Sequence, residues 1–423
     1  MARDLSQTGQ FTNGIFADDP GAQPKPGRFF APAYPMLISL VSRLDPGLAS
    51  WVSCHAAQPY VDTAVCPGSA QTLFAVQVLM AAVGMACIFS IALNLSGSPL
   101  VAWIAMLMTL ATGQPALYAK TYLSENPSFL AFYLFLASLV AAVARRNHWM
   151  LGAAGASLAL AALSRPSYLY LYYAVIAALA LLALARPPRN LGFSWRSAAL
   201  FAAAGLAVLA PWLLRNFLMF GDPSLTSGYG GFILAQRLAY NQMSWQEWGA
   251  YWIVGLPDFG DRLAAAILPK SAFVRFDYGN PSSFYLLGNG KFMADTLAAA
   301  GGRENHLHYL LQSVLLPDLI KHVAVTLPMT MSGMWPGKYL ALLAVVCAWP
   351  VGSRLREAGR LAPYLALVLP LAFMTLLHGF VSVNVVRYNV PLLSLYSFVA
   401  AFVVLDISTR IYKRVGRANP NGL

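Results

Sequence analysis

Charged side chains are scarce in this chain of 423 residues. They make up 10% of the sequence, whereas hydrophobic residues make up 58% and the mean hydropathy is +0.58. So few charges and so many apolar residues exclude an ordinary soluble domain. The composition therefore predicts an all-α polytopic membrane protein, because lipid-exposed backbone must satisfy its own hydrogen bonds.

Residue types that bind metals are also few. The sequence has six histidines and four cysteines, and the histidine pair closest in sequence is His306 and His308, in a polar stretch. No spacing typical of metal ligands is present, so we predict no metal site, and a requirement for a divalent cation stays open. Tandem repeats, a low-complexity tail and a soluble catalytic domain are likewise missing from the sequence.

Apolar runs of membrane-spanning length recur along the chain instead. Crossing about 30 Å of hydrocarbon takes roughly 20 apolar residues in a helix. We predict spans over Leu73–Leu93, Leu100–Lys120, Phe129–Ala144, Leu151–Leu163, Tyr168–Ala185, Ala198–Phe217, Tyr339–Val351, Pro363–Phe380 and Pro391–Ile411.

Basic residues follow the positive-inside pattern, which argues against nucleic-acid binding despite a net charge of +12. They lie in short connections and in the tail: Arg145, Arg146, Arg186, Arg189, Arg354, Arg356, Arg360, Arg410, Lys413, Arg414 and Arg417. These segments are predicted to face the cytoplasm. The alternation of sides divides the chain into a first outer loop (1–70), a six-span bundle (71–218), a large outer loop (219–337), three C-terminal spans (338–412) and a cytoplasmic tail (413–423).

Two further apolar stretches are predicted to lie at the outer interface. PAYPMLISLVSRL is too short to span and suits an interfacial helix. Leu315–Met334 is nearly long enough to span, but counting it as a span would break the alternation of sides, so an interfacial or re-entrant helix is expected.

In the first outer loop, Cys54 and Cys66 either form a disulfide or remain two thiols.

The N-terminus is predicted outside, yet MARDLSQTGQFTNG is polar and has no apolar core typical of a signal peptide. We therefore expect a missing upstream segment. Either Met1 is an internal methionine of a longer protein, or the chain is a natural truncation.

Charges also lie at the predicted outer ends of four separate spans: Glu125, Arg165, Arg215 and Arg387. Any one arginine there could be a snorkelling side chain, and Glu125 could simply complement a helix dipole. Their convergence at one membrane face instead predicts a functional site, because charges against hydrocarbon are costly. Guanidinium groups suit phosphate, and Lys120 and His378 are weaker additions to the same site.

Several sequence blocks resemble those of a known family. MARDLSQTGQF, APAYPMLISLV, LSENPSFLAF, ALSRPS, PWLLRNFLMFGDP and VRYNVPLLSLY look like successive blocks of GT-C-fold glycosyltransferases that use polyprenyl-phosphate sugars. The similar proteins include bacterial members of the protein mannosyltransferase and aminoarabinose transferase superfamily. The resemblance runs in the same order through most of the chain.

The resemblance implies a GT-C-like helical bundle in the bacterial inner membrane, with its site facing the periplasm. The implied enzyme moves a sugar from a polyprenyl-phosphate carrier to a glycolipid, polysaccharide or protein acceptor, with inversion at the anomeric carbon. Glu125 corresponds to the acidic residue near the donor phosphate and is a candidate catalytic residue, and Arg165, Arg215 and Arg387 are implied phosphate ligands. The usual catalytic Asp precedes the MARDL block and is absent here, which leaves Asp18 and Asp19 as candidate bases. The alternatives are a polyprenyl-lipid flippase and an inactive truncated homologue.

Overall fold

The computed structural model describes residues 1–14, 25–57, 66–185 and 194–418. In these ranges the chain forms helices and no strand, apart from an isolated bridge between Thr12 and Pro26. Eight helical segments of the described residues are long and apolar enough to cross a membrane. The protein is thus an all-α polytopic membrane protein, as the composition predicted.

The membrane bundle corresponds to the predicted spans, with two of its helices shorter than the rest. Its helices are α4 (Gln71–Ser96), α5 (Pro99–Ala111), α7 (Glu125–Arg145), α8 (Trp149–Ser164), α9 (Ser167–Leu184), α10 (Trp195–Phe220), α18 (Tyr339–Glu357), α19 (Leu361–Val381) and α20 (Leu393–Ala418). The short ones are α5, with 13 residues, and α8, with 16 residues. The last helix continues past residue 412, into the part predicted as a tail.

One predicted span is wrong as a continuous helix. The stretch from Leu100 to Lys120 breaks after α5 and continues as the short helix α6 (Gln114–Ala119). Gly113 stands at the break with a φ of 71°, a left-handed conformation that glycine adopts without steric cost. The break gives α6 its own direction, and its residue Tyr118 comes close to the charged site described below.

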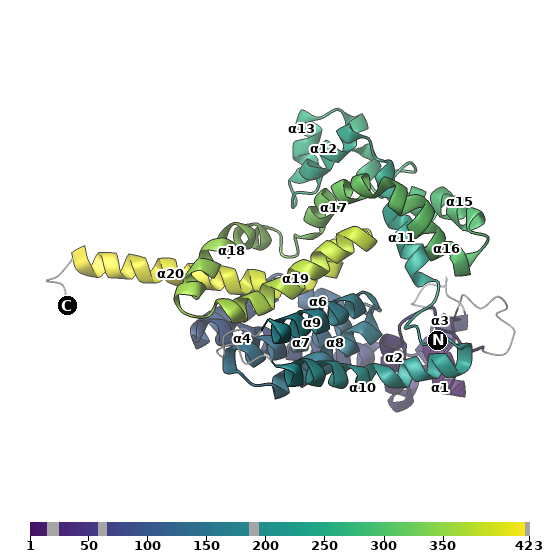
Figure 1. The fold of residues 1–423 in the computed structure, drawn as a ribbon, viewed down its shortest axis with the longest axis horizontal. Coiled ribbons are helices and arrows are strands. Elements are labelled where there is room, and N and C mark those ends of the chain that lie inside the picture. The colour runs from purple at the N-terminus through teal and green to yellow at the C-terminus, as the bar shows by residue number, and fades with distance from the viewer. Residues whose placement is uncertain (15–24, 58–65, 186–193, 419–423) are drawn as a thin grey trace.

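The polar segments form short helices outside the bundle. They are α1 (Ala2–Thr8), α2 (Ala33–Leu44), α3 (Pro46–Ala57), α11 (Tyr229–Ala239), α12 (Trp245–Val254), α13 (Gly260–Ile267), α14 (Phe284–Asn289), α15 (Lys291–Ala299), α16 (Arg303–Tyr309) and α17 (Leu319–Gly333). The predicted interfacial helix in the first outer loop is therefore present as α2. Helices α1 to α3, α11, α15 and α16 lie at one end of the bundle, and the C-terminus lies at the other end (Figure 1).

The two ends of α7 distinguish the two sides that the charge pattern predicts. At its C-terminal end, Arg145 Nε donates to Asn94 Oδ1 at 2.9 Å, and nearby Arg360 Nη1 donates to the Leu95 carbonyl at 3.1 Å. These arginines belong to connections predicted to be cytoplasmic. At the N-terminal end of α7, Glu125 instead meets residues predicted to be outside. The two ends of α7 thus separate residues of the connections predicted to be cytoplasmic from residues predicted to be outside.

Helix α17 crosses the C-terminal end of α19. A ring nitrogen of His322 lies 2.9 Å from the Phe380 carbonyl oxygen, and Thr330, two turns further along α17, packs against Gly379. Because both turns contact the same end of α19, α17 crosses that end instead of running beside α19 through the bundle. This crossing fits the predicted interfacial position of the segment, although its length and composition would also allow a span.

Small residues let the bundle helices approach closely. A side chain at Gly155 of α8 would collide with the backbone of Phe201 in α10, and one at Gly205 of α10 would collide with the Tyr172 ring. Contacts between small residues are a common way to pack membrane helices, because lipid provides no hydrophobic drive for their association. These contacts fix the positions of α8, α9 and α10 relative to one another. Arg165, a residue of the charged site, directly follows α8.

Candidate functional site

The start of α7 is fixed by a chain of hydrogen bonds. Helix α7 begins at Glu125 itself, with Ser124 at the N-cap, so Asn126 is not its capping residue. The Asn126 side chain instead donates to the Gln77 carbonyl of α4 at 2.6 Å, and Gln77 Nε2 donates to the Thr121 carbonyl at 3.2 Å. These bonds tie α4, α7 and the turn after α6 together, and they hold Glu125 at the outer end of the bundle.

Two arginines converge on Glu125. Arg165 Nη1 lies 3.5 Å from Glu125 Oε1, and Arg387 Nε lies 3.6 Å from the same oxygen. The Glu125 side chain is 5% exposed, that of Arg165 is 17% exposed, and that of Arg387 is 46% exposed. One carboxylate between two guanidinium groups leaves one positive charge. We call Glu125, Arg165, Arg387 and Tyr388 the Glu125 cluster.

Tyr388 joins the two cations of the cluster. The Cζ atom of Arg165 lies 4.2 Å from the centroid of the Tyr388 ring, and that of Arg387 lies 5.4 Å from it. Arg165 is the extended residue between α8 and α9, whereas Arg387 and Tyr388 belong to the 3₁₀ turn η9 (Val386–Leu392) that precedes α20. A cation over an aromatic face is attracted by the ring quadrupole, so Tyr388 helps to hold both guanidinium groups in place.

The two weaker candidates differ in their positions. His378 is buried, and its ring centroid lies 5.4 Å from that of Tyr388, so it adjoins the Glu125 cluster. Lys120 is exposed at the C-terminal end of α6. Among the described residues, the ion pairs of Glu125 are with the two arginines and not with Lys120.

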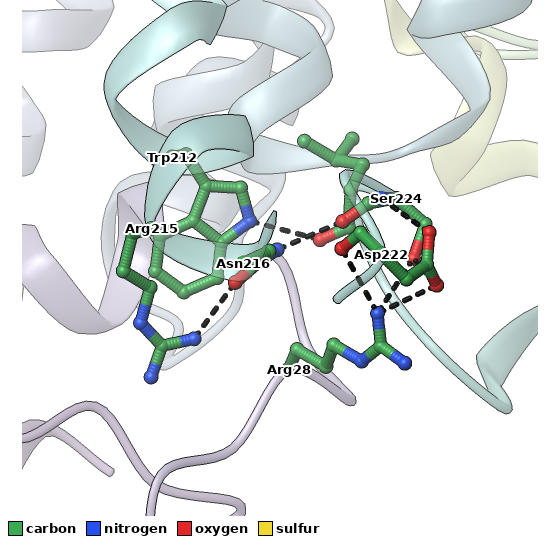
Figure 2. A network of polar contacts seen from close by, with 7 residues as sticks. Arg28, Trp212, Arg215, Asn216, Asp222 and Ser224 are labelled. Carbon is green, nitrogen blue, oxygen red and sulfur yellow. Dashed lines mark hydrogen bonds and ion pairs between the residues drawn. The ribbon is translucent and has the colours of Figure 1, made fainter. Parts of the chain in front are cut away.

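Arg215 contacts the N-terminal segment of the chain. Its Nη1 donates to the Gly27 carbonyl at 2.8 Å, and its Nη2 donates to the Phe11 carbonyl at 3.0 Å. The guanidinium group also lies over the Trp212 ring, with Cζ at 4.7 Å from the centroid. In the neighbouring network of Figure 2, Arg28 Nη1 donates to Asp222 Oδ2 at 2.6 Å. Arg215 thus holds the N-terminal segment against α10, and its hydrogen bonds in the described part of the chain are to this segment and to Asn216, not to the Glu125 cluster.

Other predicted residues have mixed outcomes. Cys54 and Cys66 form a disulfide, with their Cα atoms 5.7 Å apart, which closes the end of α3 onto the start of the bundle. Asp18 and Asp19 lie outside the described residues. In the part of the chain that the structure describes, no group of three or more histidine, cysteine or acidic side chains is arranged to hold a metal ion.

A cavity of about 460 Å³ adjoins the Glu125 cluster. It lies between the outer-loop helices α11 and α14 and the segment 382–388, and Arg387 and Tyr388 belong to both the cavity and the cluster. Its other polar lining includes Tyr229, Gln236 and Asn289. Arg387 is the one charged residue among the described residues that line it. The cavity therefore combines aromatic rings, amides and one cation, and it lacks a carboxylate.

Comparisons with family models, with curated proteins and with solved structures found no match. The functional argument therefore depends on the geometry of the cluster and the cavity. The sequence blocks that resemble GT-C glycosyltransferases add an expectation of the chemistry.

One important residue was not predicted. Arg237 of α11 is fully buried and donates four hydrogen bonds, two of them to the Gly379 carbonyl at 2.7 Å and the His322 carbonyl at 3.1 Å. The other two go to Asn241 Oδ1 at 3.0 Å and to Thr326 Oγ1 at 3.0 Å. We call these bonds the Arg237 network. A charge within the apolar stretch GGFILAQRLA was the available signal, because a buried charge needs partners.

The Arg237 network joins three elements next to the site. Gly379 belongs to the last turn of α19, where carbonyl groups lack partners within the helix. A cation is favoured at this end of the helix dipole, so the C-terminus of α19 replaces a carboxylate partner. Burial lowers the pKa of Arg237 to about 9, which leaves the side chain charged at neutral pH. The network holds α11 and α17 against the end of α19, one residue beyond His378.

Proposed function

We propose that this chain is a membrane glycosyltransferase that uses a polyprenyl-phosphate sugar and works at the outer face of the inner membrane. The observation that carries the proposal is the net positive Glu125 cluster beside a cavity lined by tyrosines and amides. The positively charged cluster suits the phosphate of an anionic lipid headgroup. The neighbouring cavity suits the sugar that the phosphate carries. The resemblance of the sequence blocks to GT-C enzymes supports the same reaction.

In the proposed reaction, Arg165 and Arg387 bind the phosphate of the donor. Guanidinium groups bind phosphate oxygens bidentately and remain charged. As the bond between the sugar and the phosphate breaks, negative charge grows on the leaving phosphate, and the two cations stabilise it. The acceptor oxygen forms the new bond to the anomeric carbon as the bond to the phosphate breaks, and its proton passes to a carboxylate base, for which the sequence offers Asp18 and Asp19.

Glu125 suits the role of a positioning residue in this reaction. Its carboxylate is buried and shared between two guanidinium groups, which compete for its lone pairs. It therefore holds the cations at one spacing rather than taking a proton from the acceptor. This differs from the catalytic role that the sequence suggested for it.

Binding of undecaprenyl phosphate to the full chain in lipid nanodiscs tests the phosphate site. Each charge-assisted hydrogen bond is worth about 1.5–3 kcal/mol, so Arg165→Gln and Arg387→Gln should each weaken binding by about 10- to 150-fold. Arg262→Gln is the matched control, because Arg262 is an exposed arginine of α13 in the same outer loop. Equal binding by the control and both cluster variants would refute the site.

Release of undecaprenyl phosphate from polyprenyl-phosphate sugars tests the reaction itself. The wild-type chain and Arg262→Gln should release it in the presence of a membrane extract that supplies acceptors, and Arg387→Gln should not. Movement of the intact donor between leaflets without release would favour a lipid transporter. Donor binding with neither release nor movement would identify an inactive homologue.

A further inference from the structure

We propose that the cavity beside Arg387 binds a neutral or acidic sugar headgroup and rejects a protonated amino sugar. This proposal deepens the proposed function and depends on it, because it takes the Glu125 cluster as the donor phosphate site. The next paragraphs give the charge, the polar groups and the size that carry it.

The charge of the cavity has one sign. Arg387 is its single charged lining residue in the described part of the chain, and no aspartate or glutamate lines it. Glu125 offsets only one of the two guanidinium charges beside the cavity, so the net charge there stays positive. Arg387 contacts Glu125 through Nε and also has a side-chain hydrogen bond with Tyr388, and a guanidinium group has five N–H donors, so this half-exposed side chain keeps donors for a ligand. An ammonium group in the cavity would meet a positive charge and no carboxylate.

The uncharged lining is suited to hydroxyl groups. Gln236 Nε2 donates to Asn289 Oδ1, and Asn289 Nδ2 donates to the Tyr285 carbonyl at 3.0 Å, so each amide is held in one orientation. Burial raises the pKa values of Tyr229 and Tyr278, so both hydroxyls stay protonated and are able to donate. Tyrosine rings supply apolar faces next to these donors. This mixture of aromatic surface and a few fixed polar groups is typical of a small-ligand site.

The size of the cavity sets an upper limit on the ligand. Its volume of about 460 Å³ falls in the lower part of the range for small-molecule pockets, which is about 300–1,000 Å³. It therefore suits a headgroup of one or two sugar rings rather than a long glycan.

Saturation-transfer NMR on the full chain in nanodiscs tests the charge preference with three soluble probes. Methyl glucoside is neutral, glucuronic acid is anionic and glucosamine is cationic, and all three have the same ring. The wild-type chain should bind the first two at least about tenfold more tightly than glucosamine, since each tenfold corresponds to about 1.4 kcal/mol. Equal binding of glucosamine and glucuronic acid, or binding of none of the probes, would overturn the proposal.

A charge change within the cavity gives the decisive comparison. Gln236→Glu places a carboxylate of nearly the same shape in the lining, and Asn289→Asp does so at a more exposed position. Either variant should weaken glucuronic acid binding and strengthen glucosamine binding, each by about tenfold. Gln246→Glu is the matched control, because Gln246 is exposed on α12 and outside the cavity. An unchanged preference in folded Asn289→Asp would also overturn the proposal.

The two proposals fail in different ways. Sugar binding with the expected charge preference, but without release of undecaprenyl phosphate from any donor, would refute the glycosyltransferase and retain the sugar site. Release that is equally fast with neutral, acidic and amino-sugar donors would refute the preference and retain the enzyme.

Discussion

Replacing Arg237 with methionine should detach the outer loop from the membrane bundle locally. Methionine has a similar length but no hydrogen-bond donor, so it fills part of the space and removes the donor that the acceptors of the Arg237 network share. The Gly379 carbonyl loses its donor at the end of α19. The His322 carbonyl keeps one donor, because Thr326 Oγ1 also donates to it at 2.7 Å.

The size of the effect follows from the groups left unpaired. A buried acceptor without a donor costs about 1–3 kcal/mol, and two acceptors lose the Arg237 donor, namely the Gly379 carbonyl and Asn241 Oδ1, which keeps a contact of 3.3 Å with a His322 ring nitrogen. Loss of the cation at the end of the α19 dipole adds up to about 2 kcal/mol. The substitution also removes a buried charge, so the desolvation penalty of that charge no longer opposes folding, and this offsets part of the loss. We therefore expect the free energy of local opening to fall by about 3–4 kcal/mol, which is about two to three orders of magnitude in the opening equilibrium.

Hydrogen exchange measured by mass spectrometry checks this prediction on the full chain in nanodiscs. Amides of α11 and α17 should exchange about 100- to 1,000-fold faster in Arg237→Met, whereas those of α7 and α8 should not change. Arg262→Met, at an exposed position of α13, is the control for loss of a positive charge. Exchange of α11 at the same rate in both variants would refute the reasoning, because it would mean that the network does not hold the loop.

Two further predictions concern the bundle and the N-terminal segment. Gly155→Ala should destabilise the protein by about 1–3 kcal/mol in thermal unfolding, because the added Cβ would meet the backbone of α10. Gly249→Ala in α12 is the control. Its Cβ would meet nothing within 4 Å, so this variant should be neutral or stabilising. Equal unfolding temperatures would contradict this. The Ser224 hydroxyl, and then Arg28, lower the pKa of Asp222 below its ordinary value of 3.8. The resulting stabilisation is complete above that value and is lost as the pH falls through the lowered pKa. Protease cleavage of the N-terminal segment should therefore increase at acid pH in the wild type but not in Asp222→Asn.

The sequence by itself determined the class and most of the helices, and it predicted the sides of the membrane. Apolar runs and the placement of arginines such as Arg145 and Arg360 are local signals, because hydrocarbon penalises every polar group along a span in the same way. The same reasoning correctly brought Glu125, Arg165 and Arg387 to one face. It failed between Leu100 and Lys120, where one glycine ends a helix within an otherwise apolar run.

Tertiary structure alone decided which of the outer charges meet. Arg215 has the same sequence signals as Arg165, namely an arginine at the outer end of an apolar run, but it lies against the N-terminal segment. The cavity is assembled from three segments that are far apart in the sequence, so no spacing of Gln236 and Asn289 indicated it. Side-chain partners are set by how helices pack, and packing depends on small contacts such as Gly155 on α10 that composition and periodicity do not specify.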